Sequence, residues 1–230
     1  MSDFKHIYAS QAEEYDLLVS AEDYEQNLIA ALAGLFEPAG ARVLEIGVGT
    51  GRVTRQLVEL GAEIAGYEQS AAMLDVARDR LPINGWSCEI ADVRECDLGQ
   101  GWADAAVAGW VLGHFCDWYA NAWETEIDAV LQRMRGALKP GGVLILVETL
   151  GTGALTPAAP TAALAAYYAH LEAQWGMRRA EIRTDYRFAS AREAADRLEF
   201  FFGPELAARI LANDWRVVPE WTGVWSRRAG

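Results

Sequence analysis

The sequence predicts an α/β fold in which a mostly parallel sheet carries helices on both faces. Short apolar runs that are typical of buried strands alternate with stretches at helical spacing over residues 40–150. Parallel neighbours need crossover connections of a dozen or more residues, and the helical stretches are long enough to provide them. A sheet of this kind is buried on both faces, which explains why its strands read as continuous apolar runs.

The composition is that of one large domain, or of a core with a modest insertion. The chain has 230 residues, of which 52% are apolar and 23% are charged, so a sizeable core can form. No stretch approaches the ~18 uninterrupted apolar residues of a membrane span. The first residues carry acids where a secretory signal would need a basic and then an apolar run. We therefore expect a cytoplasmic protein that does not enter a membrane.

The charge balance argues against a nucleic-acid partner. The chain carries 20 Lys and Arg against 33 Asp and Glu, a net charge of −13, and such a surface repels phosphate backbones. Cys88, Cys96 and Cys116 are odd in number and form no Cys-x-x-Cys pair, so neither a disulfide framework nor a zinc site is indicated. We expect free thiols in a reducing cytosol, no metal and no nucleic acid.

The elements of the first 150 residues can be assigned in order. Ser20 can cap a helix over 20–36, which Pro38 would end. The apolar run 42–46 predicts the first strand, and the run 142–148 predicts the fifth. Between these two strands we expect helix 52–60, strand 63–68, helix 70–80, strand 86–91, strand 103–110 and helix 123–138.

The remaining residues predict helical cap insertions and two closing strands. The segment 151–163 contains glycine and two prolines, so we expect a surface loop. A helix over 164–175 should follow, then a strand over 180–188, a helical segment over 191–212 and a last strand over 215–225.

Three glycines at alternate positions form the most informative motif. Gly47, Gly49 and Gly51 follow a buried strand and precede a helix. Glycines let the chain turn sharply and let a ligand approach without meeting a Cβ atom, while the helix N-terminus offers unpaired N–H groups. In a parallel sheet this loop lies at the carboxyl end of the first strand, where such folds bind ligands.

Acidic residues follow the next two strands. Glu68 stands 21 residues after Gly47, a spacing at which nucleotide-binding sheets place an acid on the ribose hydroxyls. A solvated carboxylate at a strand end is the alternative. Asp92 ends the third strand and could accept the adenine amino group, with Val93 beside the ring. The strand ends together predict a nucleoside site.

The position of Glu45 separates two classes of cofactor. Dinucleotide sites favour Gly-x-Gly-x-x-Gly, with the pyrophosphate at the helix N-terminus. This chain has Gly-x-Gly-x-Gly, with the Glu45 carboxylate two residues before the first glycine. A carboxylate at that place would repel a pyrophosphate but can lie near a cationic amino acid moiety. The pattern therefore favours S-adenosylmethionine over a nicotinamide or flavin dinucleotide.

The chain resembles a class I S-adenosylmethionine-dependent methyltransferase of the small-molecule type. The resemblance covers about residues 40–150, in the segments LEIGVGTGRVT (44–54), GYEQSAAMLDVA (66–77), IADV (90–93), WADAAVAGWVLGHF (102–115) and LKPGGVLILVE (138–148). It implies a Rossmann-like sheet of seven strands with an antiparallel last strand. We expect a single domain over 1–230, composed of an N-terminal lid or helix (1–38), a cofactor-binding core (39–150), and a cap with the closing strands (151–230).

The resemblance also implies S-adenosylmethionine as the cofactor and assigns its contacts. The three glycines would pack against the methionine portion, which Trp110 would flank. Glu68, where the family usually has Asp, would hold the ribose. In related enzymes an N-terminal segment folds over the cofactor, often through tyrosine; an amphipathic helix packed on the sheet edge is the alternative for this segment. The expected cofactor-binding residues are Tyr15, Glu45, Gly47, Gly49, Gly51, Glu68, Gln69, Met73, Asp92, Val93 and Trp110.

Two histidines are candidates for catalysis. His114 follows the fourth strand and should face the reactive end of the cofactor, where it could act as a base or be only structural. His170 is a second candidate, in the insertion after the fifth strand. That insertion should roof the acceptor pocket with Tyr167, Tyr168 and Trp175, although aromatic residues at helical spacing also suit a core.

The preferred hypothesis is methyl transfer to O, N or S of a small metabolite by a monomer or a homodimer. A protein or RNA acceptor is a second hypothesis that keeps the same cofactor. A third is a scaffold that binds S-adenosylmethionine without turnover, because the glycine motif and both acids predict binding in every version. A dinucleotide oxidoreductase is the fourth.

Overall fold

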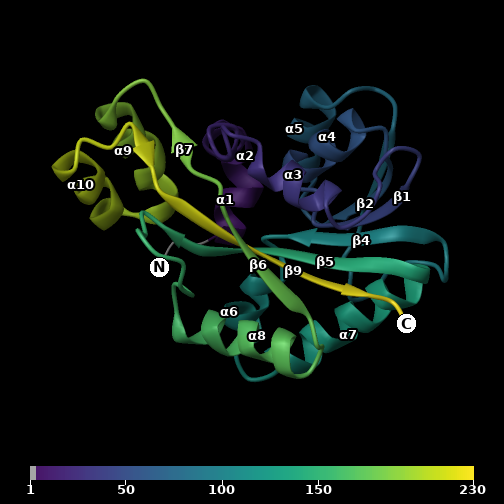
Figure 1. The fold of residues 1–230 in the computed structure, drawn as a ribbon. Coiled ribbons are helices and arrows are strands. Elements are labelled where there is room, and N and C mark those ends of the chain that lie inside the picture. The colour runs from purple at the N-terminus through teal and green to yellow at the C-terminus, as the bar shows by residue number, and fades with distance from the viewer. Residues whose placement is uncertain (1–3) are drawn as a thin grey trace.

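A seven-stranded sheet forms the centre of the computed structural model, which describes residues 4–230 (Figure 1). Its order is β3-β2-β1-β4-β5-β9-β6. The first five strands in this order are parallel, and β9 runs antiparallel to both of its neighbours. The Rossmann-like sheet with an antiparallel last strand is thus confirmed. The strands are β1 (Arg42–Ile46), β2 (Glu63–Glu68), β3 (Trp86–Ile90), β4 (Ala103–Gly109), β5 (Leu138–Thr152), β6 (Arg178–Arg183) and β9 (Glu220–Arg228).

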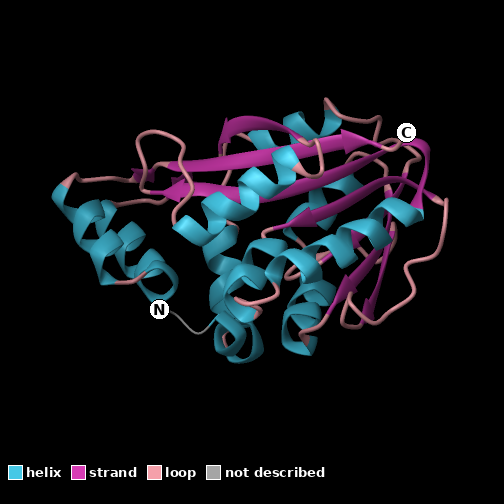
Figure 2. Cartoon of the chain, turned by 90° about the horizontal axis from the view of Figure 1, so that it is seen from below, coloured by secondary structure: helices cyan, strands magenta, loops and turns pink. Residues whose placement is uncertain are grey.

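Helices cover both faces of this sheet (Figure 1). Val43 and Leu44 are neighbours on β1 but belong to different buried clusters, because successive side chains of a strand point to opposite faces. One face is covered by α3 (Asn27–Ala33), α4 (Arg52–Glu59) and α5 (Ala71–Arg80). The other, seen from below in Figure 2, is covered by α6 (Phe115–Trp118), α7 (Trp123–Ala137) and α8 (Ala162–Ala173).

A third group of elements lies beyond the carboxyl ends of the parallel strands (Figure 1). The short strands β7 (Tyr186–Arg187) and β8 (Val217–Val218) pair with each other. They share a buried cluster with α9 (Ala191–Phe202), α10 (Pro204–Ala212) and Leu18 of α2 (Ala12–Val19). This group and α1 (Phe4–Ser10) stand at the end of the sheet where ligands are expected.

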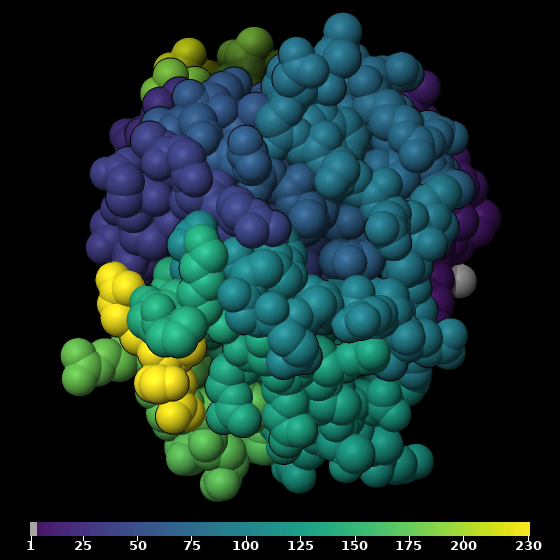
Figure 3. All heavy atoms as spheres, turned by 90° about the vertical axis from the view of Figure 1, so that its right-hand side faces the viewer, coloured from purple at the N-terminus to yellow at the C-terminus, as the bar shows by residue number. Residues whose placement is uncertain are grey.

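The opposite end of the molecule is closed by backbone pairing. Figure 3 shows that end, with the last residues of the chain beside the first part of β5. The amide of Gly141 donates to the carbonyl of Ala229 at 3.2 Å, and the amide of Ala229 donates to Gly142 at 2.7 Å.

The first expected helix is wrong in its start. The chain turns between α2 and α3, and Ser20 caps no helix over 20–36. The carboxylate of Asp23 accepts hydrogen bonds from the amides of Asn27 and Leu28 at 2.8 and 2.9 Å. This acid therefore pairs N–H groups at the start of α3 that have no partner within the helix.

Several closing elements are divided or extended relative to their expected ranges. The helical segment 191–212 breaks at Gly203, which has a φ of +86° and precedes the proline that starts α10. The strand 215–225 divides at Pro219, which has no N–H for a ladder. The expected loop 151–163 begins late, because β5 continues to Thr152 opposite Glu220 of β9.

Candidate active site

The glycine turn after β1 adopts a backbone that suits glycine. Gly47, Gly49 and Gly51 have φ angles of +72°, +59° and +91°, a region that other L-residues rarely adopt. A Cβ on Gly47 would stand 2.2 Å from the Val111 side chain, whereas one on Gly49 meets nothing closer than 3.5 Å. Gly47 and Gly49 line a cleft at this end of the sheet.

Gly51 serves a different purpose from the other two glycines. It does not line the cleft, and a Cβ there would lie 2.7 Å from the side chain of Leu81, at the end of α5. The small residue therefore allows α4 and α5 to pack together.

Glu68 connects the glycine turn to the end of β2. Its carboxylate accepts the Gly49 amide at 2.9 Å and the Ser70 amide at 2.7 Å. Burial raises the pKa of this carboxyl, although hydrogen bonds from the Ser70, Gly49 and Gln69 amides oppose the rise. Glu68 lines the cleft, where Gln69 and Met73 also lie, and a carboxylate can accept further hydrogen bonds.

Asp92 and Val93 reach the same cleft from the end of β3. The Arg94 guanidinium forms a bidentate ion pair with Asp92. Its Nε and Nη2 donate to the carboxylate, and the shortest distance, from Nη2 to Oδ2, is 2.6 Å. These hydrogen bonds lower the pKa of Asp92, so the group is a carboxylate at neutral pH. The apolar wall and the nearby acid suit a flat, amine-bearing ring.

Two N-terminal tyrosines cover the cleft. Tyr8 of α1 and Tyr15 of α2 line it, with their ring centroids 5.3 Å apart. The Ser70 hydroxyl donates to the Tyr8 carbonyl at 2.8 Å and ties α1 to α5. With these rings in place the cleft has a volume of about 100 Å³, well below the ~300–1,000 Å³ of sites for drug-sized ligands.

His114 lies behind these tyrosines, in the turn after β4. Its Nε2 is 3.0 Å from the Tyr8 hydroxyl, and its ring stacks on Trp118 with centroids 4.9 Å apart. Burial lowers the pKa of His114 to about 4, because an imidazolium would lose its hydration. The imidazole is therefore neutral at pH 7.

Trp110 directly follows β4 and has a strained conformation, with a φ of +54°. The Arg52 guanidinium lies over its ring, 3.6 Å from the centroid, and forms a two-pronged ion pair with Glu22 at 2.7 and 2.8 Å. The cation of Arg52 is thus neutralised by a buried acid.

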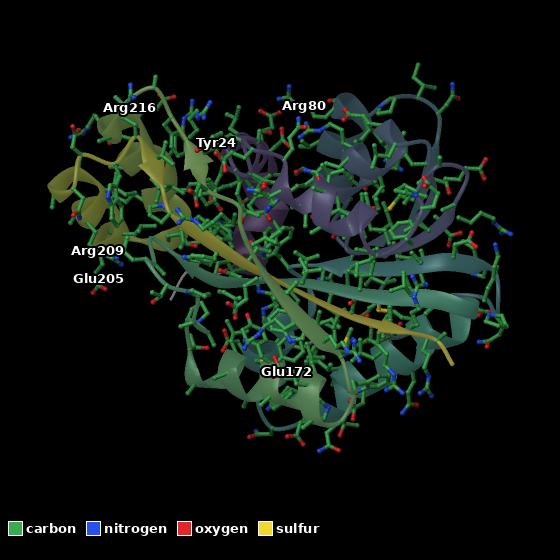
Figure 4. All side chains as sticks on the ribbon, viewed as in Figure 1. Tyr24, Arg80, Glu172, Glu205, Arg209 and Arg216 are labelled. Atoms are coloured by element: carbon green, nitrogen blue, oxygen red, sulfur yellow. The ribbon has the colours of Figure 1, made fainter. Side chains whose placement is uncertain are left out.

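A second cavity adjoins the cleft. Its volume is about 600 Å³, and it shares Tyr8, Tyr15, Trp110 and His114 with the cleft. The other walls come from α2, α8, α9 and α10 and from the strands β5 and β9. Figure 4 shows Glu205 and Arg209 of α10, which belong to this wall. Residues from the two halves of the chain therefore meet at one place.

Three expected site residues lie away from both cavities. Glu45 is buried beneath the turn and accepts the Thr54 hydroxyl at 2.7 Å. His170 bonds to Asp128 at 2.7 Å on the far face of the sheet. Gly51 is the third, as described above. The structure does not bring these residues to Tyr15, Gly47, Gly49, Glu68, Gln69, Met73, Asp92, Val93, Trp110 and His114, which it gathers around the cleft.

The expected aromatic roof is core instead. Tyr167, Tyr168 and Trp175 are buried in the cluster beneath the sheet, because their helix lies flat against that face. α8 contributes to the second cavity only through Ala163 and Leu164 near its start. No group of metal-ligating side chains occurs among residues 4–230.

Sequence reasoning missed several residues of the second cavity. Glu148 follows the apolar part of β5 and could have been found by the same strand-end argument that found Glu68. Glu22 and Glu220 carry no local signal, since only the folding of distant segments brings them to this wall. Arg52 directly follows the glycine turn and starts α4, and its position there indicates a helix residue rather than a cavity residue.

A methyltransferase domain family matches residues 44–146 of the chain. A dTDP-3-amino-3,6-dideoxy-alpha-D-glucopyranose N,N-dimethyltransferase of Streptomyces fradiae is 31% identical over 59% of this chain and 51% of that protein. An uncharacterized methyltransferase of Bacillus cytotoxicus is 26% identical over 65% of this chain and 68% of its own length. The chain therefore spans about half to two thirds of the length of these relatives.

Solved structures share the fold. A Mesorhizobium loti S-adenosylmethionine-dependent methyltransferase is 21% identical with a TM-score of 0.51, over 86% of this chain and 96% of that one. A Haemonchus contortus phosphoethanolamine N-methyltransferase 2, solved with S-adenosyl-L-methionine, is 17% identical with a TM-score of 0.59, over 96% of this chain and 59% of that one. Among residues 4–230, no helix is long and apolar enough to cross a membrane.

Proposed function

We propose that this chain is a class I S-adenosylmethionine-dependent methyltransferase that methylates O, N or S of a small metabolite, since residues 44–146 match a methyltransferase domain family. The observation that carries the proposal is the junction of the two cavities. A cleft built around the glycine turn and Glu68 adjoins a cavity of about 600 Å³, and His114 and Trp110 line both.

The residues of the cleft fit S-adenosylmethionine, which supplies a methyl group on a cationic sulfur when it is bound. Glu68 has lone pairs for the two ribose hydroxyls, and the Gly49 backbone leaves space where a Cβ would stand. Asp92 can accept the adenine amino group beside Val93. The contacts at Tyr15, Gln69, Met73 and Trp110 belong to the same proposal.

The lid is part of the proposed mechanism. A cleft of about 100 Å³ is too small for this ligand, so α1 and α2 move outward when it binds. Their return would place Tyr8 and Tyr15 over it and exclude water. We include in the proposal a single domain over residues 1–230, with α1 and α2 as its lid.

The size of the second cavity favours a small acceptor. Its volume lies within the ~300–1,000 Å³ of small-molecule sites, and the Streptomyces relative is named for a sugar nucleotide substrate. The net charge of −13 disfavours RNA. A protein acceptor, RNA, or binding without turnover are the alternatives.

His114 is proposed to orient the acceptor. It lines both cavities and stays neutral at pH 7, so it can accept a hydrogen bond from a nucleophile. His170 has no comparable position.

We further propose that the protein is cytosolic, which its three free cysteines support, and that it is a monomer or a homodimer.

The test has two stages. Equilibrium dialysis with S-adenosylmethionine measures cofactor binding, and release of S-adenosylhomocysteine with a metabolite panel measures turnover. Binding with turnover supports the proposal. Binding without turnover on any metabolite supports the scaffold, and no binding at millimolar S-adenosylmethionine contradicts the proposal altogether. Preferential binding of NAD(H) in calorimetry would favour an oxidoreductase.

A further inference from the structure

We infer that the second cavity takes an amine-bearing small molecule and that Glu220 and Glu148 hold its cationic nitrogen. This inference rests on the proposed function and narrows its acceptor to nitrogen. It comes from the charges, the unsatisfied hydrogen-bonding capacity and the aromatic walls of the cavity.

Glu220 presents an unused acceptor. The side chain lines the cavity, and the residue is only 2% exposed. Its Oε1 accepts the Thr149 hydroxyl at 2.8 Å, while Oε2 has no partner in hydrogen-bonding geometry within residues 4–230. A buried carboxylate oxygen without a donor is costly. An ammonium group, which carries only donors, would satisfy it.

Glu148 supplies a second acid on the neighbouring strand. It lines the cavity, is 4% exposed, and accepts the Gly113 amide at 2.9 Å. That amide belongs to the residue before His114, which lines both cavities. Glu148 pairs with Gly223 and Thr149 with Thr222, and Glu220 bonds to Thr149 rather than lying beside Glu148. Because successive side chains of a strand point to opposite faces, the two acids reach the cavity from the two faces of the β5–β9 pair.

The protein supplies little positive charge to oppose these acids. The lining contains five carboxyl side chains and two guanidinium groups. Arg52 is held by Glu22, and Arg209 donates to the Gly153 carbonyl at 2.7 Å. Glu220 and Glu148 have no ion pair among the described residues. Burial raises the pKa of both Glu220 and Glu148 to about 8. A cation near this wall would favour their ionised forms and be attracted by them, whereas a phosphate or carboxylate would oppose that ionisation.

Aromatic rings complete the surroundings of the expected cation. Rings attract an ammonium group over their faces, and they exclude water, which strengthens its contact with the carboxylates. An alcohol or thiol acceptor would gain from neither effect. The aromatic lining residues are Phe4, Tyr8, Tyr15, Trp110, Tyr186, Phe201 and Phe202.

The carboxylates can also accept the proton that the ammonium nitrogen must lose before it can receive a methyl group. An ammonium has no lone pair, so it first gives one proton to a carboxylate and becomes the neutral amine. The nitrogen then forms its bond to the methyl carbon while the carbon–sulfur bond breaks and leaves its electron pair on sulfur. Burial raises the pKa of Glu148 to about 8, so this acid is mostly protonated at pH 7 in the free protein. A neighbouring cation favours its ionised form, and the ionised group can then accept the proton of the ammonium.

The test compares amines with alcohols of the same skeleton, for instance 2-phenylethylamine with 2-phenylethanol, across a panel of primary and secondary amines. Calorimetry measures their binding to the protein saturated with S-adenosylhomocysteine. We expect amines to bind and alcohols to bind at least about tenfold more weakly. Glu220→Gln should weaken amine binding by at least about tenfold. Glu199→Gln, an exposed acid on α9 outside the cavity, should leave it unchanged.

The outcomes distinguish a failure of the amine assignment from a failure of the proposed function. If S-adenosylhomocysteine binds but no amine does, or if amines bind equally to the wild type and to both Glu220→Gln and Glu148→Gln, the amine assignment is overturned and the proposed function stands. If neither S-adenosylmethionine nor its product binds, the proposed function itself fails. Mass spectrometry of turned-over amines should locate the added methyl on nitrogen. Should Glu220→Gln not fold, Glu148→Gln alone carries the comparison, with the same expected loss.

Discussion

Glu68 shows how much a single side chain contributes to the cleft. It holds the Gly49 and Ser70 amides in place, and in our proposal it also accepts the ribose hydroxyls. In Glu68→Gln the amide nitrogen must face one of these N–H donors. We expect the Kd for S-adenosylmethionine to rise by about 10–100-fold, as measured by equilibrium dialysis.

Glu63→Gln is the matched control for that variant, since Glu63 is an exposed acid at the other end of the same strand. Its affinity for S-adenosylmethionine should equal that of the wild type. Equal losses in both variants would mean that Glu68 does not contact the ligand.

His114 should stay neutral over the whole physiological range. Burial lowers its pKa to about 4, so NMR titration of its ring protons should show no change between pH 5.5 and 8. His114→Asn should reduce turnover but retain affinity for S-adenosylmethionine, since an acceptor is misplaced and the cleft is kept. Normal turnover in His114→Asn and His114→Ala would remove any catalytic role.

At the scale of the element, the turn after β1 depends on two separate properties of glycine. Gly47→Ala would combine a left-handed backbone with a Cβ only 2.2 Å from Val111. Gly141→Ala has the backbone penalty alone, because its φ is +80° and nothing lies within 4 Å. We expect about 1–2 kcal/mol of destabilisation for Gly141→Ala and about 1–3 kcal/mol more for Gly47→Ala. Urea unfolding measures both, and equal losses would contradict the close packing at Gly47.

The two N-terminal helices should govern how long the cofactor stays bound. Deletion of residues 1–18 removes Tyr8 and Tyr15 from above the cleft, so we expect retention of S-adenosylmethionine to be lost in dialysis. The double variant Tyr8→Phe/Tyr15→Phe keeps both rings and should retain most of the binding. A deletion variant that is folded by circular dichroism and binds as tightly as the full chain would rule out the lid.

The elements that sequence predicts best are those whose signals are local. Residues 63–68 form β2 as expected, because apolar alternation ends there at an acid before a capped helix. The sequence alone predicts that Gly47, Glu68 and Asp92 lie close together, since each follows a strand and parallel strands end at one edge of the sheet. Gly51 shares their motif, but its neighbour is Leu81, and spacing alone does not reveal such packing.

The second cavity is the part that sequence patterns could not predict. Glu220 belongs to it because β9 inserts between β5 and β6, and Glu22 belongs to it because the chain turns after α2. The aromatic positions of α8 followed a helical period, but the period says only that they share a face. Whether that face meets a core or a ligand depends on how the helix lies on the sheet.

At the scale of the whole molecule, buried carboxyls should make stability fall as pH rises. Burial raises the pKa of both Glu45 and Glu148 from 4.5 to about 8. A raised pKa in the folded state gives stability that is full below pH 4.5 and is lost as pH rises through 8. Each group can lower the free energy of unfolding by up to about 1.4 kcal/mol per pH unit within that window.

Urea unfolding at pH 6 and at pH 8 should therefore show lower stability at the higher pH. Glu45→Gln should lessen this fall, since the amide cannot ionise and can still accept the Thr54 hydroxyl. Glu199→Gln should not alter it. A flat stability profile in the wild type would mean that these carboxyls are hydrated in solution.

The position of β9 also bears on the order in which a ribosome could build this protein. β6 pairs only with β9 among the described strands, and β9 begins more than thirty residues after β6 ends. A nascent chain could therefore form the parallel strands and the glycine turn early, because domains begin to fold during synthesis. Until β9 emerges, β6 has no neighbour and Glu220 is absent, so translation would complete a nucleoside pocket before the chamber that receives its reaction partner.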